Sequence, residues 1–187
     1  MTKTQLLTTL RLMHDWYLFS MLAANVVAQN PAQLTGCTME LKDPVDGRSV
    51  TFPAGDYFGK LLKNEGATSA LLGELEIALR KKVVSGTHEV LSQYCSTTHQ
   101  TALHVDQPWY QFCRILRNSV SHGRGGEVMQ WPRNLRDKGV LEVTWRHKTI
   151  RHDQGDAPIT LSNVDCLELI DEQYACCLLY TSPSPRD

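Results

Sequence analysis

The sequence predicts a mainly α-helical fold with small β-hairpin insertions. Apolar residues recur three or four apart through three long stretches, residues 4–29, 68–84 and 106–122, which is the period of an amphipathic helix. Strand-like residues flank turn sequences in only two places, within 37–52 and 140–161. With 187 residues and 42% hydrophobic composition, the chain can bury one core, so we expect a single domain over residues 1–176.

Residues 4–29 are expected to form a long core helix that ends before Asn30-Pro31. Arg11, His14 and Asp15 interrupt the apolar run, so this segment is too polar for a membrane span. Its apolar stripe is Leu6, Leu10, Met13, Tyr17, Met21, Ala24 and Val27.

The next hundred residues are predicted to hold a hairpin and several helices. The hairpin lies within residues 37–52, and a short helix is expected near residues 56–63. The helix at 68–84 starts with Thr and Ser and ends in a basic turn, which complements its dipole. Ser85-Gly86-Thr87 is predicted to break it, and a further helix is expected from Thr87.

The helix at 106–122 shows the clearest separation of apolar and polar residues. Asp106 is its expected N-cap, Pro108 fits its first turn, and Gly123 is its expected stop. At 100° per residue, Gln111, Arg114, Asn118 and His122 share one side, with Arg117 on the flank. The opposite, docking side carries Trp109, Phe112, Cys113, Leu116 and Val120.

The C-terminal third is predicted to contain a loop at 124–134, a hairpin and a last helix. The hairpin would pair residues 140–145 with 158–161 across a turn containing Gly155, and the helix would start at Asn163. Residues 177–187 (CLLYTSPSPRD) resemble a translated sequencing-library adapter. We therefore expect these eleven residues to be an artefact of an environmental or draft assembly, with the natural C-terminus truncated.

Charge and cysteine usage narrow the functional classes. Residues 114–151 carry nine Lys/Arg against three Asp/Glu, a net charge of +6 that points to a polyanion, although a solvated face of mixed charge would look the same. The six cysteines form no Cys-x-x-Cys pair, which favours reduced thiols in the cytoplasm and argues against zinc. The histidines lack ligand spacing as well, so we expect no metal and no cofactor.

Arg117-Asn118-Ser119-Val120-Ser121-His122 at the end of the amphipathic helix resembles the shared motif of the HEPN superfamily (higher eukaryotes and prokaryotes nucleotide-binding). The resemblance implies a helical bundle that forms a homodimer through the motif helix. It also implies a metal-independent endoribonuclease in which the ribose 2′-OH attacks the adjacent RNA phosphate. A role in a toxin–antitoxin pair or in phage defence would follow, with an antitoxin or nucleotidyltransferase as a possible partner.

The residue types suit that chemistry. His122 can exchange a proton near neutral pH, and the fork of Arg117 matches the oxygens of a phosphorane. Asn118 can orient the imidazole or a phosphate oxygen, while Arg114 and Arg124 extend the cationic strip for RNA binding. In an ideal helix Arg117 and His122 point about 140° apart, so they converge only if the helix unwinds near Ser121 or a second subunit supplies the complement.

Two alternatives stay open at this point. The chain could be a non-catalytic HEPN-like binding module, for example the partner of a nucleotidyltransferase. It could also be an unrelated helical protein, in which Arg117 and Asn118 tie the bundle to a neighbouring segment and His122 caps the helix.

Overall fold

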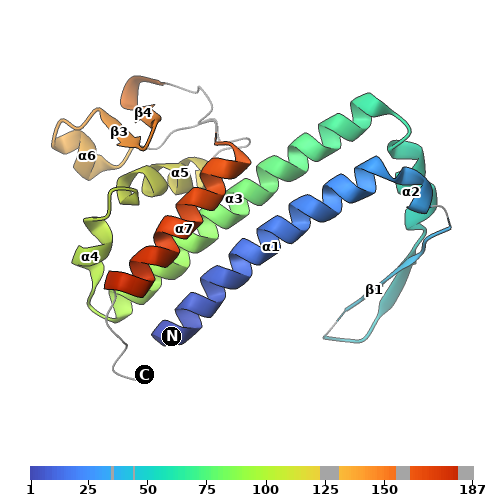
Figure 1. The fold of residues 1–187 in the computed structure, drawn as a ribbon, viewed down its shortest axis with the longest axis horizontal. Coiled ribbons are helices and arrows are strands. Elements are labelled where there is room, and N and C mark those ends of the chain that lie inside the picture. The colour runs from blue at the N-terminus through green and yellow to red at the C-terminus, as the bar shows by residue number, and fades with distance from the viewer. Residues whose placement is uncertain (35, 44, 123–130, 155–160, 181–187) are drawn as a thin grey trace. The chain divides into compact units, whose positions relative to one another are not determined.

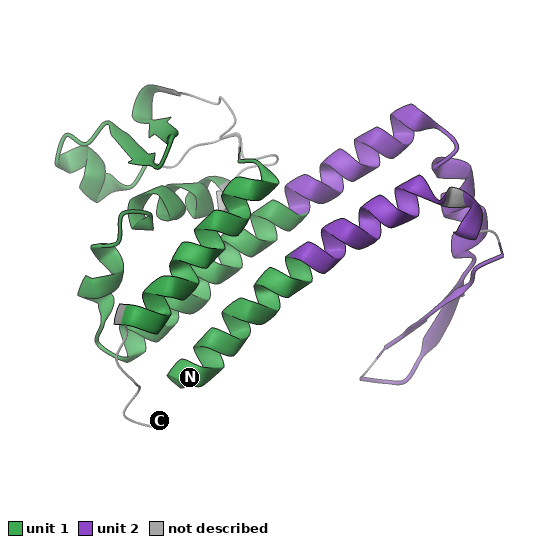
Figure 2. Ribbon diagram, in the orientation of Figure 1, with its two compact units in different colours: residues 1–17, 79–187 green, residues 18–78 purple. Residues whose placement is uncertain are grey.

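The chain is mainly α-helical and carries two small antiparallel hairpins, as the sequence predicts (Figure 1). The computed structural model describes residues 1–34, 36–43, 45–122, 131–154 and 161–180. Its contacts divide the chain into two compact units (Figure 2). Unit 1 comprises residues 1–17 and 79–187, and unit 2 comprises residues 18–78. The long helices α1 (Lys3–Gln29) and α3 (Glu65–Thr97) contribute to both units.

Unit 1 holds most of the buried apolar side chains. The predicted stripe on α1 is confirmed there, because Leu6, Leu10 and Tyr17 are fully buried. The Tyr17 hydroxyl also donates a 2.7 Å hydrogen bond to Asn163 Oδ1 at the start of α7 (Asn163–Tyr180). The other buried apolar residues of this core come mainly from three helices: Val83, Leu91 and Tyr94 of α3, Phe112, Ile115 and Leu116 of α5 (Tyr110–His122), and Cys166, Leu169 and Ile170 of α7.

Helix α3 runs without interruption through Ser85-Gly86-Thr87, so the predicted break at this point is wrong. A Cβ built on Gly86 would lie 2.3 Å from Met13 Cε. Gly86 thus lies against the far end of the flexible, half-buried Met13 side chain of α1. Thr87 Oγ1 donates a 2.9 Å hydrogen bond to the carbonyl oxygen of Val83. This bond satisfies the buried hydroxyl group within the helix, so Thr87 does not interrupt α3.

The predicted start of the motif helix is also wrong. Asp106 is the C-cap of a separate short helix, α4 (Thr101–Val105), and a turn at residues 107–109 precedes α5. The Tyr110 amide donates to Gln107 O at 3.0 Å, and the Cys113 amide donates to Trp109 O at 2.9 Å. The local turn at Gln107-Pro108 thus takes the place of a side-chain cap.

The C-terminal hairpin pairs different residues from those predicted. Strand β3 (Glu142–Trp145) pairs with β4 (Lys148–Arg151) across a two-residue turn in which Arg146 has a φ of 50°. Trp145 and Ile150 point inward and are buried. Leu161 is not in a strand, and the rest of the predicted second strand lies outside the described residues. A short helix, α6 (Arg133–Asp137), occupies the end of the predicted loop.

Helix α7 begins with a reciprocal capping box, as its Ser/Asn start predicts. The Ser162 amide donates to Asp165 Oδ2 at 2.7 Å, and the Asp165 amide donates to Ser162 Oγ at 3.1 Å. The hairpin is fastened to the same helix, because Trp145 Nε1 donates to Glu172 Oε2 at 2.7 Å. The helix continues to Tyr180 and buries Cys177, the first residue of the adapter-like segment.

Unit 2 is poor in buried side chains. It contains the second half of α1, the 3-10 turn η1 (Pro31–Leu34), β1 (Met39–Lys42) paired with β2 (Ser49–Phe52), α2 (Ala54–Leu61) and the first half of α3. The predicted first hairpin and the short helix after it are thus confirmed. Gly55 allows close approach here, because a Cβ on it would lie 2.1 Å from Leu34 O. None of the helices in the described part of the chain could cross a membrane.

Candidate functional site

One side of helix α5 is buried, and the polar residues on its other side are half-buried. The predicted docking residues Trp109, Phe112, Cys113 and Leu116 are buried. Gln111, Arg114, Arg117 and Asn118 are half-buried, as the angular separation predicts. The buried side is wider than predicted, because it also includes Ile115 and Ser119. The Ser119 hydroxyl is accommodated there by a 3.0 Å hydrogen bond to Ile115 O.

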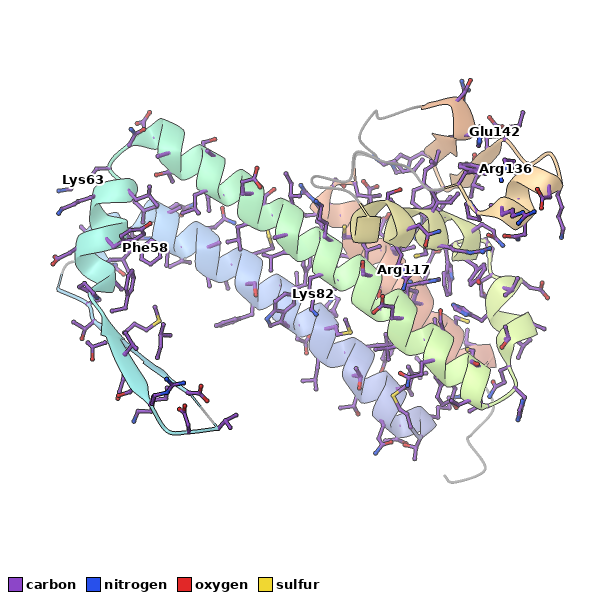
Figure 3. The ribbon with its side chains drawn as sticks, turned by 180° about the vertical axis from the view of Figure 1, so that it is seen from behind. Phe58, Lys63, Lys82, Arg117, Arg136 and Glu142 are labelled. Atoms are coloured by element: carbon purple, nitrogen blue, oxygen red, sulfur yellow. The ribbon has the colours of Figure 1, made fainter. Side chains whose placement is uncertain are left out.

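Arg117 reaches from α5 to α3, where it contacts Glu89 (Figure 3). Its Nε and Nη2 atoms each lie 3.2 Å from Glu89 Oε1. Its Nη1 atom makes a longer contact of 3.5 Å with Asn118 Oδ1. With 38% of the Arg117 side chain exposed, the fork is held in place yet accessible from solvent. A guanidinium has five N–H donors, so this arrangement leaves capacity for phosphate oxygens.

Arg114 is fixed by a different neighbour. Its Nη1 atom donates a 2.8 Å hydrogen bond to Asn134 Oδ1 on α6. The two arginines are three residues apart on α5 and are both half-buried. They therefore form a short cationic strip whose ends are tied to α3 and to α6.

Two buried histidines lie next to this strip, and nothing in their sequence spacing marks them as neighbours of the two arginines. His88 on α3 and His104 on α4 have ring centroids 5.6 Å apart, and both rings pack against Tyr110 of α5. His88 is 6% exposed and His104 is 3% exposed. Burial lowers the pKa of each to about 4, helped for His88 by Arg117 and Arg114 and for His104 by His88. Both rings are therefore neutral at pH 7.

Several buried polar atoms beside these histidines lack a hydrogen-bond partner in the described part of the chain. On α3, three of the side chains concerned lie within about 60° of arc. Buried polar atoms are normally paired with protein or with ordered water, so ordered water is expected to pair with such atoms. The unpaired atoms are Ser85 Oγ, His88 Nδ1, Ser92 Oγ, His104 Nε2 and Gln111 Oε1.

The remaining predicted site residues are only partly described. His122 is the last residue of α5, and its backbone therefore lies five positions beyond Arg117 on the same helix. Its side chain, like that of Val120, lies outside the described residues, and so does Arg124. The structure thus brings Arg117, Asn118 and Arg114 together on one helix side. The convergence of Arg117 with His122 stays a prediction.

Known proteins add no assignment to this geometry. No family model, curated protein or solved structure matches the chain.

Thiol chemistry at this site is disfavoured. Cys113 lies on α5 but is fully buried, and burial raises the pKa of its thiol, although a 3.2 Å hydrogen bond from Gln173 Nε2 acts in the opposite direction. A thiol that stays protonated is a poor nucleophile. The described residues also contain no group of three or more metal-ligating side chains. The polar side of α5 thus presents two fixed cations, Arg114 and Arg117, and the amide of Asn118, which are suited to binding an anion.

Proposed function

We propose that the protein is a metal-independent endoribonuclease of HEPN type, acting on RNA in the cytoplasm. The observation that carries the proposal is the fixed, half-exposed Arg117 fork, placed beside Asn118 on the polar side of the helix that ends at His122. A guanidinium held by one carboxylate oxygen presents its remaining donors with little loss of conformational entropy on binding phosphate. The net positive charge of residues 114–151, to which nine Lys/Arg contribute, favours the same substrate.

The reaction would be an internal transfer of the phosphoryl group. The imidazole of His122 accepts the proton of the ribose 2′-OH, and the 2′-oxygen forms a bond to the adjacent phosphorus. The bond from phosphorus to the 5′-oxygen then breaks, and that oxygen takes a proton from an imidazolium or from water. Arg117 stabilises the charge on the non-bridging oxygens, and Asn118 orients one of them or the imidazole. The products are a 2′,3′-cyclic phosphate and a free 5′-OH.

A homodimer formed through the motif helix would supply a second Arg117 and His122 to the same cleft. This pairing resolves the angular problem, because groups about 140° apart on one helix can each meet a complement from the other copy. Light scattering at tens of micromolar should then report at least two chains. A monomer at that concentration would count against both the pairing and the catalytic arrangement.

Variants of the proposed site give the functional test. His122→Ala should lower the cleavage rate by roughly 10²–10⁴, the usual contribution of a positioned acid or base. Arg117→Lys should also lose most activity, because a point charge does not reproduce a two-pronged fork. His147→Ala and Arg48→Ala are matched controls on exposed side chains, 69% and 81% accessible, and should retain full activity.

A second candidate is a non-catalytic HEPN-like binding module, whose partner would be an antitoxin or a nucleotidyltransferase. The contact between Arg117 and Glu89 favours it, because an arginine that ties α5 to α3 needs no substrate. In that case the wild type leaves RNA intact, and His122→Ala keeps its affinity for the partner. The neighbouring gene would indicate whether the setting is a toxin–antitoxin pair or a phage-defence cluster.

A further inference from the structure

The second half of α1 is mostly apolar, with Ser20, Asn25 and Gln29 as its polar residues, and its side chains are covered mainly on one side. Residues 18–29, all of which the structure describes, include no buried side chain. Met21 and Ala24 are half-buried and continue the inner stripe of the helix. The opposite side, which we call the outer α1 face, consists of Leu18, Phe19, Leu22 and Val26, with 42%, 70%, 63% and 46% of each residue exposed.

These four residues lie on the part of α1 that belongs to unit 2, which is purple in Figure 2. At 100° per residue they fall within about 100° of arc, centred about 160° from the inner stripe. The large apolar side chains of a helix normally face a core or a partner. Contiguous apolar surface of this kind marks an interaction site more often than an ordinary surface.

The sequence around the face indicates which partner fits it. No charged residue occurs between Asp15 and Glu40, so the face offers nothing to a partner selected by charge. In a twofold contact the same face of each copy meets the other. Two copies of the outer α1 face can do so without repulsion between like charges. Phe19, Leu22 and Val26 are spaced three and four residues apart, the interval at which one helix packs along another.

We propose that the outer α1 face binds the same face of a second copy of this chain. The four residues together expose the equivalent of about two whole side chains. With roughly 150–250 Å² for a large side chain, the face offers on the order of 400 Å² per copy. The total of about 800 Å² for two copies is below the usual range for stable interfaces, so the association is expected to be weak, with a dissociation constant in the micromolar range. The proposal does not rest on the ribonuclease reading, since it uses no residue of α5.

The test is the mass of the full-length protein, measured by sedimentation equilibrium over roughly 1–200 µM. Phe19→Lys should raise the dissociation constant by roughly 30-fold or more, because each interface loses two buried rings and gains two charges. At a concentration where the wild type is associated, the average mass of Phe19→Lys should fall toward half that of the wild type. Val45→Lys is the matched control, because Val45 is 93% exposed in the β1–β2 turn of the same unit.

A crosslink reports the geometry directly. In a Cys37→Ser background, which removes the exposed native thiol, Leu22→Cys should form a disulfide-linked dimer under mild oxidation, and Val45→Cys should not. Circular dichroism of Phe19→Lys should match the wild type, since the residue it replaces is mostly exposed.

Three results would overturn the proposal. The first is equal mass for the wild type and Phe19→Lys at every concentration. The second is equal loss of association in Val45→Lys. The third is binding of the wild type, but not of Phe19→Lys, to phosphatidylcholine vesicles without self-association in solution. Pairing through the motif helix is tested separately by Arg117→Lys. This variant should leave the association that Phe19→Lys weakens unchanged. RNA cleavage is likewise read in its own assay.

Discussion

Acidification should destabilise unit 1 through His88 and His104. The pKa of each ring is about 4 in the folded protein, against an ordinary value near 6.5, because the rings are buried and lie near cations or each other. Between these two values the unfolded chain binds more protons than the folded one. The stability is therefore fully present above pH 6.5 and is lost progressively as the pH falls toward 4.

The size of the effect follows from the two pKa values. At pH 5 an unfolded histidine is almost fully protonated and a folded one with a pKa of about 4 is mostly neutral, which costs about 2 kcal/mol for each ring. Two rings together give about 4 kcal/mol. This is a large share of the roughly 5–15 kcal/mol by which domains of this kind are stable.

Urea unfolding at pH 7.5 and pH 5.0, followed by circular dichroism, measures this difference. In the double variant His88→Gln and His104→Gln, the loss between the two pH values should shrink by about 4 kcal/mol relative to the wild type. The comparison uses the pH difference, so any general destabilisation by the substitutions cancels. His147→Gln, on an exposed ring, should keep the full loss. An unchanged pH difference in the double variant would refute the reasoning.

Two further substitutions test local packing and capping by urea unfolding. Gly86→Ala should stabilise the protein by about 0.5–1 kcal/mol, because the helix gains the propensity of alanine and the new Cβ meets only the terminal methyl of the flexible, half-buried Met13 side chain, which moves aside. A loss of stability that disappears in a Met13→Ala background would contradict this. Ser162→Ala should cost about 1 kcal/mol by removing one half of the capping box of α7, while Ser162→Thr should retain most of it, and equal losses would argue against a cap.

The helical content was predictable because it depends on local periodicity. The spacing of Leu6, Leu10 and Tyr17 fixes which side of α1 is buried, and Ser162 with Asp165 marks the start of α7. The break predicted at Gly86 failed because one glycine costs a helix only about 1 kcal/mol, which the burial of Val83, Val84 and Leu91 against the rest of unit 1 outweighs. No local pattern carries that information.

The errors at the hairpin and in the site have the same origin. Pro158-Ile-Thr-Leu161 is the more apolar segment, but the polar Lys148–Arg151 pairs with β3 because a two-residue turn and the burial of Ile150 favour it. That Arg117 and Asn118 lie side by side followed from their spacing on one helix, and their catalytic role stays a prediction. Glu89, His88 and His104 were missed because only the packing of α3 and α4 against α5 places them beside the arginines.

The most direct test of the ribonuclease proposal is the chemistry of the RNA ends produced in the presence of EDTA. Purified wild type is incubated with a single-stranded or loop-containing RNA, and the products are analysed for 2′,3′-cyclic phosphate and free 5′-OH, beside His122→Ala. The proposal predicts cyclic phosphate ends at a rate that EDTA does not change and that His122→Ala lowers by roughly 10²–10⁴. Intact RNA, cleavage that requires added metal, or full activity in His122→Ala would contradict it.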